Sequence, residues 1–320
     1  MEGLDIKQIR KEYGAKCAVD SISFQARAGE ITGILGPNGA GKTTAIRMIM
    51  GITAPDDGEI QFSLNGTTYP GVPKSMVGYL PEERGLYKEA RVIDVLFFLA
   101  GLKNVDKAVI KERAMTWLAK FGLEDYATSK IEQLSKGMAQ KVQFIASILH
   151  QPKLIILDEP FSGLDPVSQD VFKAEIRELA NQGATILLSS HQMNIVEELC
   201  DRIFLIHQGR EVSYGTVQEI KEQYGNYRVI VWAHQDIHEV VSLPSVAHYN
   251  QPGSKRWVLT LKDGVRPADF LASIPSTATI SELSIARMSL HDIFVKIAQG
   301  GINDETDLED SPMGNHAELA

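Results

Sequence analysis

The sequence has few cysteines and no long apolar segment. Only Cys17 and Cys200 occur in 320 residues, without a C-x-x-C pair, so the pattern predicts neither a disulfide framework nor a zinc site and fits a reducing cytosol. The apolar run VLFFLAGL is much shorter than the about 20 residues that a membrane-spanning helix needs, and the first residues lack the apolar core of a signal peptide. We therefore expect that the chain itself does not span a membrane.

Positive charge is also scarce. The chain has 32 Lys and Arg against 41 Asp and Glu, a formal net charge of -9, with no basic block, which gives no support to nucleic-acid binding through phosphates. Residues 301–320 hold six carboxylates and no Lys or Arg, so we expect a disordered acidic tail there. With 44% hydrophobic and 23% charged residues overall, the composition is that of a folded protein, and the length suggests one or two domains.

A glycine-rich segment lies between a strand-like run, EITGIL, and a helix-like run, TTAIRMIMG. It reads GPNGAGKTT and fills the pattern G-x-x-x-x-G-K-[ST], in the strand, loop and helix order of a phosphate-binding loop. The glycines let several backbone N–H groups face one anion, Lys42 can reach the β- and γ-phosphates, and the Thr43 hydroxyl is placed to ligate Mg²⁺. The candidate nucleotide-binding residues here are Gly36, Pro37, Asn38, Gly39, Ala40, Gly41, Lys42, Thr43 and Thr44. A glycine-rich turn without a ligand is the alternative, and the spacing does not fit a G-x-G-x-x-G dinucleotide fold.

Two further apolar runs read as buried strands that end in ionisable residues. KLIILDEPFSGLDP, residues 153–166, ends its apolar part in Asp158 and Glu159. After a phosphate loop, such a pair suits Asp158 to hold Mg²⁺ through water and Glu159 to take a proton from the attacking water. GATILLSSHQM ends in His191, although a lone histidine at such a place is more often a structural residue than a catalytic one.

The segment LSKGMAQKV, residues 134–142, places a hydroxyl and a glycine at the start of a predicted helix. Ser135 and the backbone of Gly137 would make an anion site there. Met138, Val142, Ile145 and Leu149 recur at helical spacing and are expected to bury one face. An ordinary helix with Ser135 as its N-cap explains the same residues.

Six ordered segments resemble those of an ATP-binding cassette (ABC) ATPase over residues 4–224. GPNGAGKTT, GYLPEERGLY, LSKGM, LIILDEP, SGLD and SSH are similar to its Walker A, Q-loop, signature, Walker B, D-loop and H-loop segments. The resemblance implies that Tyr13 stacks on adenine, although Tyr13 is also explained as a simple strand aromatic. It further implies that His191 contacts the γ-phosphate region, that Asp165 mediates contact between two cassettes, and that Ser135 and Gly137 face the ATP of the partner cassette.

The chain departs from the family pattern at two segments. Glu82 stands where the Q-loop has glutamine; its carboxylate can approach Mg²⁺ or the lytic water but adds negative charge near the γ-phosphate. Lys136 and Met138 replace two residues of the common L-S-G-G-Q signature, and Met138 offers no amide hydrogen bond. PEERGLY together with SKGM resembles a bacterial branch of exporters that includes sodium- and drug-extruding systems.

The resemblance implies an α/β fold in several parts. Residues 1–224 are predicted to form a P-loop nucleotide-binding domain, with a helical subdomain at about 88–150, a hairpin turning at Gly209 and a last helix that stops at Gly225. Residues 225–300 are predicted to form a small α+β accessory domain, and the histidines in it have no metal-ligand spacing. Residues 301–320 are the acidic tail.

From these features we expect an ATPase subunit that binds ATP and Mg²⁺ and pairs with a second cassette, of which a second copy of itself is the favoured one. It would drive transport by a separate transmembrane permease, with export as the favoured direction. It would lie peripherally on the cytoplasmic face of the membrane, with the permease contact near residues 82–87 and Leu86 and Tyr87 as apolar anchors. The alternatives are a soluble cassette that acts on ribosomes or DNA and a nucleotide-binding module without turnover. The acidic balance and the presence of one cassette count against the first, and Glu159 and His191 count against the second.

Overall fold

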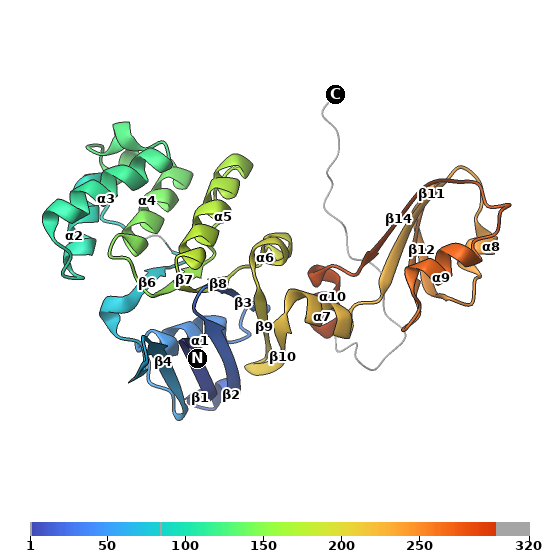
Figure 1. Ribbon diagram of the computed structural model, residues 1–320, viewed down its shortest axis with the longest axis horizontal. Helices are drawn as coiled ribbons and strands as arrows, with labels where there is room; N and C mark the ends of the chain where they lie inside the picture. The colour runs from blue at the N-terminus through green and yellow to red at the C-terminus, as the bar shows by residue number, and fades with distance from the viewer. Residues whose placement is uncertain (1, 84, 299–320) are drawn as a thin grey trace.

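The computed structural model describes residues 2–83 and 85–298, which form three sheets flanked by helices (Figure 1). We refer to residues up to 224 as the N-terminal part and to residues 225–298 as the C-terminal part. Two of the sheets lie in the N-terminal part and the third lies in the C-terminal part. The acidic tail predicted for residues 301–320 falls outside the described residues.

A six-stranded sheet with the order β10-β9-β3-β8-β7-β6 forms the centre of the N-terminal part. Its strands are β3 (Ile31–Leu35), β6 (Val77–Leu80), β7 (Leu154–Asp158), β8 (Thr185–Ser189), β9 (Arg202–His207) and β10 (Arg210–Thr216). All neighbours are parallel except β9 and β10, which form a hairpin. Strands β3, β7 and β8 are apolar runs buried on both faces, and their carboxyl ends meet at one edge of the sheet.

An antiparallel sheet and one helix cover the first face of the central sheet. The sheet has the order β2-β1-β4-β5, with β1 (Gly3–Tyr13), β2 (Lys16–Arg27), β4 (Asp57–Leu64) and β5 (Thr67–Pro70). The helix is α1 (Lys42–Ile49). Buried residues of both share one core with alternate residues of the central strands, for example Ile34 of β3 and Ile156 of β7. This core fixes β2 beside the loop that joins β3 to α1.

Helices cover the second face of the central sheet. They are α2 (Val92–Gly101), α3 (Lys107–Lys120), α4 (Lys136–Ile148), α5 (Pro166–Asn181) and α6 (Met193–Leu199), with the short 3-10 helices η2 (Glu124–Tyr126) and η3 (Ile131–Gln133). The 3-10 helix η1 (Lys74–Met76) instead packs through Met76 against the core of the first face. Phe144 of α4 and Phe172 of α5 pack with ring centroids 4.8 Å apart, and Phe121 lies 5.0 Å from Phe172. The predicted helical segment at about 88–150 therefore contains α2, α3 and α4, and its aromatic residues anchor it to α5.

The C-terminal part is built around a four-stranded antiparallel sheet with the order β12-β13-β11-β14. After α7 (Val217–Tyr224), its elements are β11 (Tyr227–Ala233), α8 (His238–Val241), β12 (Val246–Gly253), β13 (Arg256–Leu261), α9 (Pro267–Ser273), β14 (Ile280–Arg287) and α10 (Leu290–Ala298). The runs YRVIVWA, RWVLTL and ATISELSIA predict strands and correspond to β11, β13 and β14, and RPADFLASI and SLHDIFVKIAQ predict helices and correspond to α9 and α10. The sequence patterns did not predict β12 or α8. The sheet has its own apolar core, which includes Val229, Leu259 and Phe270.

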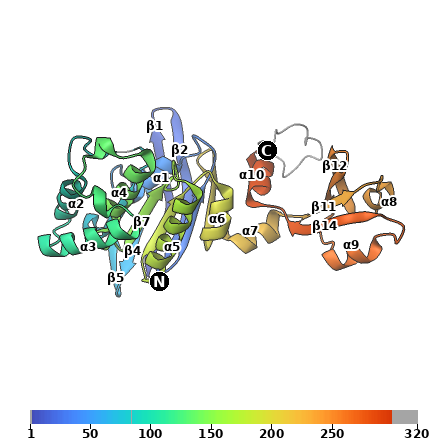
Figure 2. The ribbon, with the colours of Figure 1, turned by 90° about the horizontal axis from the view of Figure 1, so that it is seen from above.

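Helix α10 returns to the N-terminal part (Figure 2). Leu290 and Ile293 of α10 are buried in the same core as the helices on the second face of the central sheet. Glu197 of α6 binds both the ammonium of Lys221 and the backbone N–H of Leu290, the latter at 3.2 Å. The end of the described chain is therefore fastened to α6, the helix that follows His191.

The predicted α/β fold class is confirmed. Gly209, at φ 79°, lies in the tight turn between β9 and β10, and α7 ends at Tyr224 directly before Gly225, both as predicted. Within residues 2–83 and 85–298, no helix is long and apolar enough to cross a membrane.

Candidate functional site

The glycine-rich loop lies between β3 and α1, at the carboxyl edge of the central sheet. Gly39 and Gly41 have φ angles of 80° and 109°, in the left-handed region that favours glycine. A side chain at Gly41 would place its Cβ 2.5 Å from the carbonyl oxygen of Ala18, and one at Gly36 would lie 2.3 Å from that of Ile206. The loop is thus packed too closely against β2 and β9 for larger residues, which fixes the path of its backbone.

Lys42 is the first residue of α1, and its side chain returns across the loop. The ammonium donates to the carbonyls of Gly36 at 2.6 Å and Pro37 at 3.2 Å. Burial lowers the pKa of Lys42, while the carboxylates of Glu159, Asp158 and Glu82 oppose this shift and favour its charged form. The loop therefore combines a cation with the N-terminus of a helix, which is the arrangement that binds phosphate.

We expect Gly41→Ala to abolish nucleotide binding, because its Cβ would collide with Ala18 and displace the loop. The left-handed backbone alone should cost about 1–3 kcal/mol of folding free energy. Gly51→Ala is the matched control, since Gly51 has φ 65° but open space around its Cβ. Urea unfolding and ATP titration of both variants would test this: both should lose stability, whereas only Gly41→Ala should lose binding. Equal ATP affinity in the two variants would contradict the close packing.

Asp158 is the last residue of β7 and Glu159 follows it; β8 lies between β7 and β3, the strand that leads into the loop. Burial raises the pKa of both carboxyls. For Asp158, nearby Glu82 raises the pKa further, whereas Ser189 and Lys42 lower it. Glu159 has a positive φ of 51°, and its backbone N–H donates to the carbonyl of Ser189 at 2.9 Å. A non-glycine residue at such an angle is held there by its surroundings, and these outliers cluster at functional sites.

His191 and Ser190, which follow β8, hold the carboxylate of Glu159. Nδ1 of His191 lies 2.9 Å from Oε2 of Glu159, and the hydroxyl of Ser190 donates to the same oxygen at 3.4 Å. Interaction with His191 opposes the rise in the pKa of Glu159 that burial causes. The imidazole is otherwise largely exposed and borders a groove of about 740 Å³ that Ser289 and His291 also line. His191 is thus free on one side and bound to Glu159 on the other.

Glu82 follows β6 and is exposed. Its charge acts on Asp158 and on Lys42, which places it in the same electrostatic site. Together with the hydroxyl of Thr43 and the carboxylate of Asp158, it supplies hard oxygen donors, the kind that Mg²⁺ prefers. The residues present therefore fit a magnesium ion bound next to a phosphate group.

Tyr13 is the last residue of β1, and 49% of its surface is exposed. It pairs with Lys16 of β2, the strand that carries Ala18 against the phosphate-binding loop. Both uses of Tyr13 foreseen from the sequence, a strand aromatic and a platform for adenine, remain compatible with this place.

Ser135 and Asp165 both cap helices. The hydroxyl of Ser135 accepts the N–H of Met138 at 3.2 Å at the start of α4, and Asp165 accepts the N–H of Ser168 at 3.0 Å at the start of α5. A Cβ on Gly137 would lie 3.2 Å from the carbonyl oxygen of Gly163, so the signature and D-loop segments contact each other within one chain. Ser135 is therefore the N-cap of α4, one of the two roles considered from the sequence. The other role, contact with the ATP of a partner cassette, stays a prediction.

Sequence reasoning missed two glutamines on α4 that contact the site. The side-chain amide of Gln140 donates to the carbonyl of Pro160, next to Glu159, at 3.1 Å. That of Gln143 donates to the carbonyls of Pro81 and Glu83, on either side of Glu82, at 3.5 and 3.4 Å. Their only sequence signal is their place on a helix with a buried face, which does not identify a contact. Gly209 was seen only as a turn, yet its N–H donates to Ala40 in the phosphate-binding loop at 2.9 Å.

Two family profiles match the chain. Residues 19–162 match the profile described as ABC transporter, and residues 215–298 match the one described as the C-terminal domain of DrrA1-3-like ATP-binding proteins. The uncharacterized ABC transporter ATP-binding protein YhaQ of Bacillus subtilis is 38% identical over 293 residues, which cover 92% of this chain and 97% of that protein. The linearmycin resistance ATP-binding protein LnrL of the same species is 36% identical, covering 77% and 80%. The Nod factor export ATP-binding protein I of Ralstonia nicotianae is also 36% identical, covering 68% of each chain.

Solved structures give the same result for the N-terminal part. A structure described as the ATP-binding subunit of an ABC transporter is 34% identical, with a TM-score of 0.64, and the match covers 69% of this chain and 93% of that one. The cbiO1 protein from Clostridium perfringens, part of the transporter complex cbiONQ, is 26% identical with a TM-score of 0.60, covering 69% and 91%.

Proposed function

The chain belongs to the ATP-binding proteins of ABC transporters, and we propose that it hydrolyses ATP between two copies of itself to drive export through a separate permease. Membership in this family makes the chain an ATP-binding ATPase whose transporter has a permease component. The observation that carries the assignment of roles is the meeting of Lys42, Glu159 and His191 at one edge of the central sheet. Lys42 is the phosphate-binding group, Glu159 is the base, and His191 orients the base.

Each of these residues has a defined task in the proposed reaction. The loop N–H groups and the ammonium of Lys42 bind the β- and γ-phosphates of ATP. Glu159 accepts a proton from water as the water attacks the γ-phosphorus in line with the departing ADP oxygen. The contact with His191 holds the Glu159 carboxylate in one orientation. Thr43, Asp158 and Glu82 would hold Mg²⁺, which when bound would neutralise charge on the phosphate oxygens.

Two copies of the chain are proposed to enclose the nucleotides. Ser135 and the backbone of Gly137 lie at the start of α4, where a helix N-terminus favours an anion. The anion in this proposal is the γ-phosphate of the ATP bound by the other copy, and Asp165 would lie at the contact between the copies. One chain carries both halves of the arrangement, so a symmetric pair would contain two equal sites.

Sedimentation of the Glu159→Gln variant with and without Mg·ATP tests the proposed dimer, because slow hydrolysis should trap the closed form. We expect an ATP-dependent shift from monomer to dimer. The second change Ser135→Arg should abolish it, and so should Ser135→Asp, which keeps a good N-cap but places a negative charge beside the γ-phosphate. A protein that binds ATP and stays monomeric would exclude the homodimer. A dimer that survives Ser135→Asp would leave Ser135 with its capping role alone.

The proposed permease contact is an exposed apolar patch formed by Tyr87, Phe98 and Leu102. Their exposed fractions are 60%, 50% and 63%, and the rings of Tyr87 and Phe98 meet edge to face with centroids 5.8 Å apart. Leu86, the other anchor expected from the sequence, is less exposed: it is half-buried and packs against the core. Tyr87 is the last residue of the Q-loop segment, so a permease bound to the patch would press on the segment that carries Glu82.

We expect Phe98→Asp to release the chain from membranes of its source cells without changing its ATP turnover in isolation. Losing a hot-spot residue from an interface costs about 2 kcal/mol or more, or about thirtyfold in affinity, and aromatic residues are common among hot spots. Leu271→Asp on α9 is the matched control, since Leu271 is similarly exposed at 48% but lies in the C-terminal part. The measurement is the membrane-bound fraction of each variant. If only the Leu271→Asp control leaves the membrane, the permease contact lies in the C-terminal part and not at Phe98.

Export as the direction of transport is supported by the relatives. LnrL is named for linearmycin resistance and the protein from Ralstonia nicotianae for Nod factor export. We propose that the chain works in the same direction, attached through its permease to the cytoplasmic face of the membrane.

A further inference from the structure

The last residues of β1 lack the strand partner that supports the rest of it. Strand β1 pairs with β4 from Gly3 as far as Arg10, which lies opposite Asp57. Lys11, Glu12 and Tyr13 continue beyond that point and pair only with β2. A strand end held on one side frays more easily than one held on both.

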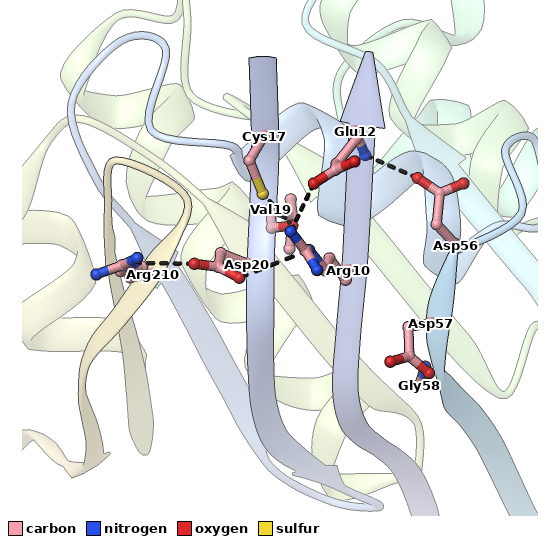
Figure 3. A network of polar contacts seen from close by, with 9 residues as sticks. All are labelled: Arg10, Glu12, Cys17, Val19, Asp20, Asp56, Asp57, Gly58 and Arg210. Atoms are coloured by element: carbon pink, nitrogen blue, oxygen red, sulfur yellow. Dashed lines mark hydrogen bonds and ion pairs between the residues drawn. The ribbon is translucent and has the colours of Figure 1, made fainter. Parts of the chain in front are cut away.

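Asp56 takes the place of the missing strand partner (Figure 3). Its carboxylate binds the ammonium of Lys11 at 2.6 Å and accepts the backbone N–H of Glu12 at 2.8 Å. Its own N–H donates to the carbonyl of Arg10, also at 2.8 Å. The pKa of Asp56 lies below its usual value, first because of the hydrogen bond from Lys11 and then because of that from Glu12, so the carboxylate is charged at neutral pH. These contacts stop one residue short of Tyr13.

Lys11 carries the support on to the ring of Tyr13. Its ammonium lies 5.9 Å from the ring centroid and is fixed by Asp56 and by the carbonyl of Ala54, at 2.8 Å. The side chain of Lys11 is mostly buried by these contacts. A cation at this distance attracts an aromatic face. Lys11 therefore restrains the ring from one side, and the exposed part of the ring is left for a ligand.

The segment that ends in Asp56, residues 52–56, is hydrogen-bonded to α1, which itself begins at the phosphate-binding loop. The N–H groups of Ile52 and Thr53 donate to the carbonyl of Arg47, in the last turn of α1, at 2.9 and 3.3 Å. Helix α1 begins at Lys42, directly after the glycines of the loop. The phosphate-binding loop is thus connected to Tyr13 through α1, residues 52–56 and Lys11, with the cation–ring contact of 5.9 Å as the last step.

We propose that Asp56 and Lys11 are positioning residues that hold the Tyr13 ring at a fixed place relative to the phosphate-binding loop, so that one nucleotide engages both. This inference rests on the proposed ATPase function and on the stacking of Tyr13 on adenine that the family resemblance implies. Neither residue touches the nucleotide; they act by ordering the ring before binding, which removes an entropic cost of association. Substituting either residue should weaken the part of the ATP affinity that adenine contributes and leave phosphate binding unchanged.

A second polar network beside this one serves as an internal comparison. Arg10 binds Glu12 at 2.5 Å and lies 3.8 Å from Asp20, which in turn binds Arg210 of β10 at 3.0 Å (Figure 3). This network braces β1, β2 and β10 against one another. The two networks share only the backbone groups of Arg10 and Glu12 that bond to Asp56. The side-chain ion pairs of this second network include neither Lys11 nor Asp56, so side-chain substitutions separate a general loss of strand support from a specific loss of ring support.

The test measures the affinity of Asp56→Ala and Lys11→Met for ATP and for inorganic tripolyphosphate, together with KM and kcat. Base–aromatic stacking is worth about tenfold or more in affinity, so Tyr13→Ala should weaken ATP binding by about that factor. Asp56→Ala and Lys11→Met should lose part of it, about threefold, and raise KM without lowering kcat. Tripolyphosphate affinity should stay unchanged in all three. Asp56→Asn, which keeps one acceptor, should fall between Asp56→Ala and the unaltered chain.

Two controls decide whether Asp56 acts through the ring. Asp57→Ala changes the neighbouring carboxylate, which accepts the N–H of the next residue, Gly58, at the start of β4, and should have no effect on ATP affinity. In a Tyr13→Ala background, Asp56→Ala should cause no further loss. Additive losses, or an equal loss of tripolyphosphate affinity, would overturn the proposal. Normal ATP binding and hydrolysis by Tyr13→Ala would contradict the positioning role and leave the ATPase function supported. If the unaltered chain releases no phosphate from ATP, the proposed function itself is wrong.

Discussion

Replacing Glu159 with glutamine is expected to lower kcat for ATP hydrolysis by about 10²–10⁴-fold, the usual contribution of a positioned general base. The amide keeps the size of the carboxylate and retains an oxygen for Ser190, whose hydroxyl lies 3.4 Å from Oε2. It has no lone pair basic enough to accept a proton from water. Since Lys42 and the loop are untouched, ATP affinity should change little. Phosphate release and nucleotide titration on the same sample would separate the two effects.

His191→Ala is the informative comparison for this variant. Nδ1 of His191 lies 2.9 Å from the carboxylate of Glu159, so its removal should disorder the base without deleting it. We expect a smaller fall in kcat than for Glu159→Gln, and no further fall when both changes are combined. A loss of only a few fold in Glu159→Gln would mean that another group, or the phosphate itself, takes the proton.

Lys42→Met is expected to weaken ATP binding by about ten- to a hundredfold, because a hydrogen bond to a charged group is worth about 1.5–3 kcal/mol. Turnover should fall further, since the ammonium also faces charge that develops on the γ-phosphate. Methionine preserves most of the stem, so the loop and α1 should keep their packing. The measurement is the dissociation constant of ATP, followed by kcat at saturating ATP.

Lys103→Met is the matched control for Lys42→Met. Lys103 is also a partly buried lysine whose pKa burial lowers, and its ammonium likewise binds backbone carbonyls, those of Lys74 and Val77. The same chemical change outside the loop should reduce stability to a similar degree and leave ATP binding unchanged. Similar losses of ATP affinity in both variants would indicate general destabilisation in place of a phosphate contact at Lys42.

The local part of the site could be predicted from the sequence because its motifs encode their own geometry. Gly41 is required at a backbone angle of φ 109° beside Ala18, and the pattern G-x-x-x-x-G-K-[ST] records that requirement in consecutive residues. The buried strands that end in Asp158 and before His191 are equally local, since their apolar runs are short and uninterrupted. Parallel pairing then brings their ends together, which the α/β fold class already implies.

Contacts between distant segments were not predictable in the same way. Asp56 is 45 residues from Lys11, and the carboxylate of an exposed turn looks the same in sequence whether or not it supports a strand. Gln143 reaches the Q-loop segment 60 residues away, at Glu83, from a helix whose apolar pattern does not mark it. Strand β12 was missed because seven of its eight residues are exposed, so it has neither the apolar run nor the alternation that indicates a strand.

The packing of α10 has a consequence for the order of events during synthesis. Leu290 and Ile293 complete a core whose other buried residues are all made at least 70 positions earlier, such as Ile220 of α7 and Val196 of α6. A growing chain exposes that apolar surface until the end of the C-terminal part has left the ribosome. The packing around α6 and α7 is therefore completed last, and a chain truncated after β14 would expose apolar surface on α6, the helix that follows His191.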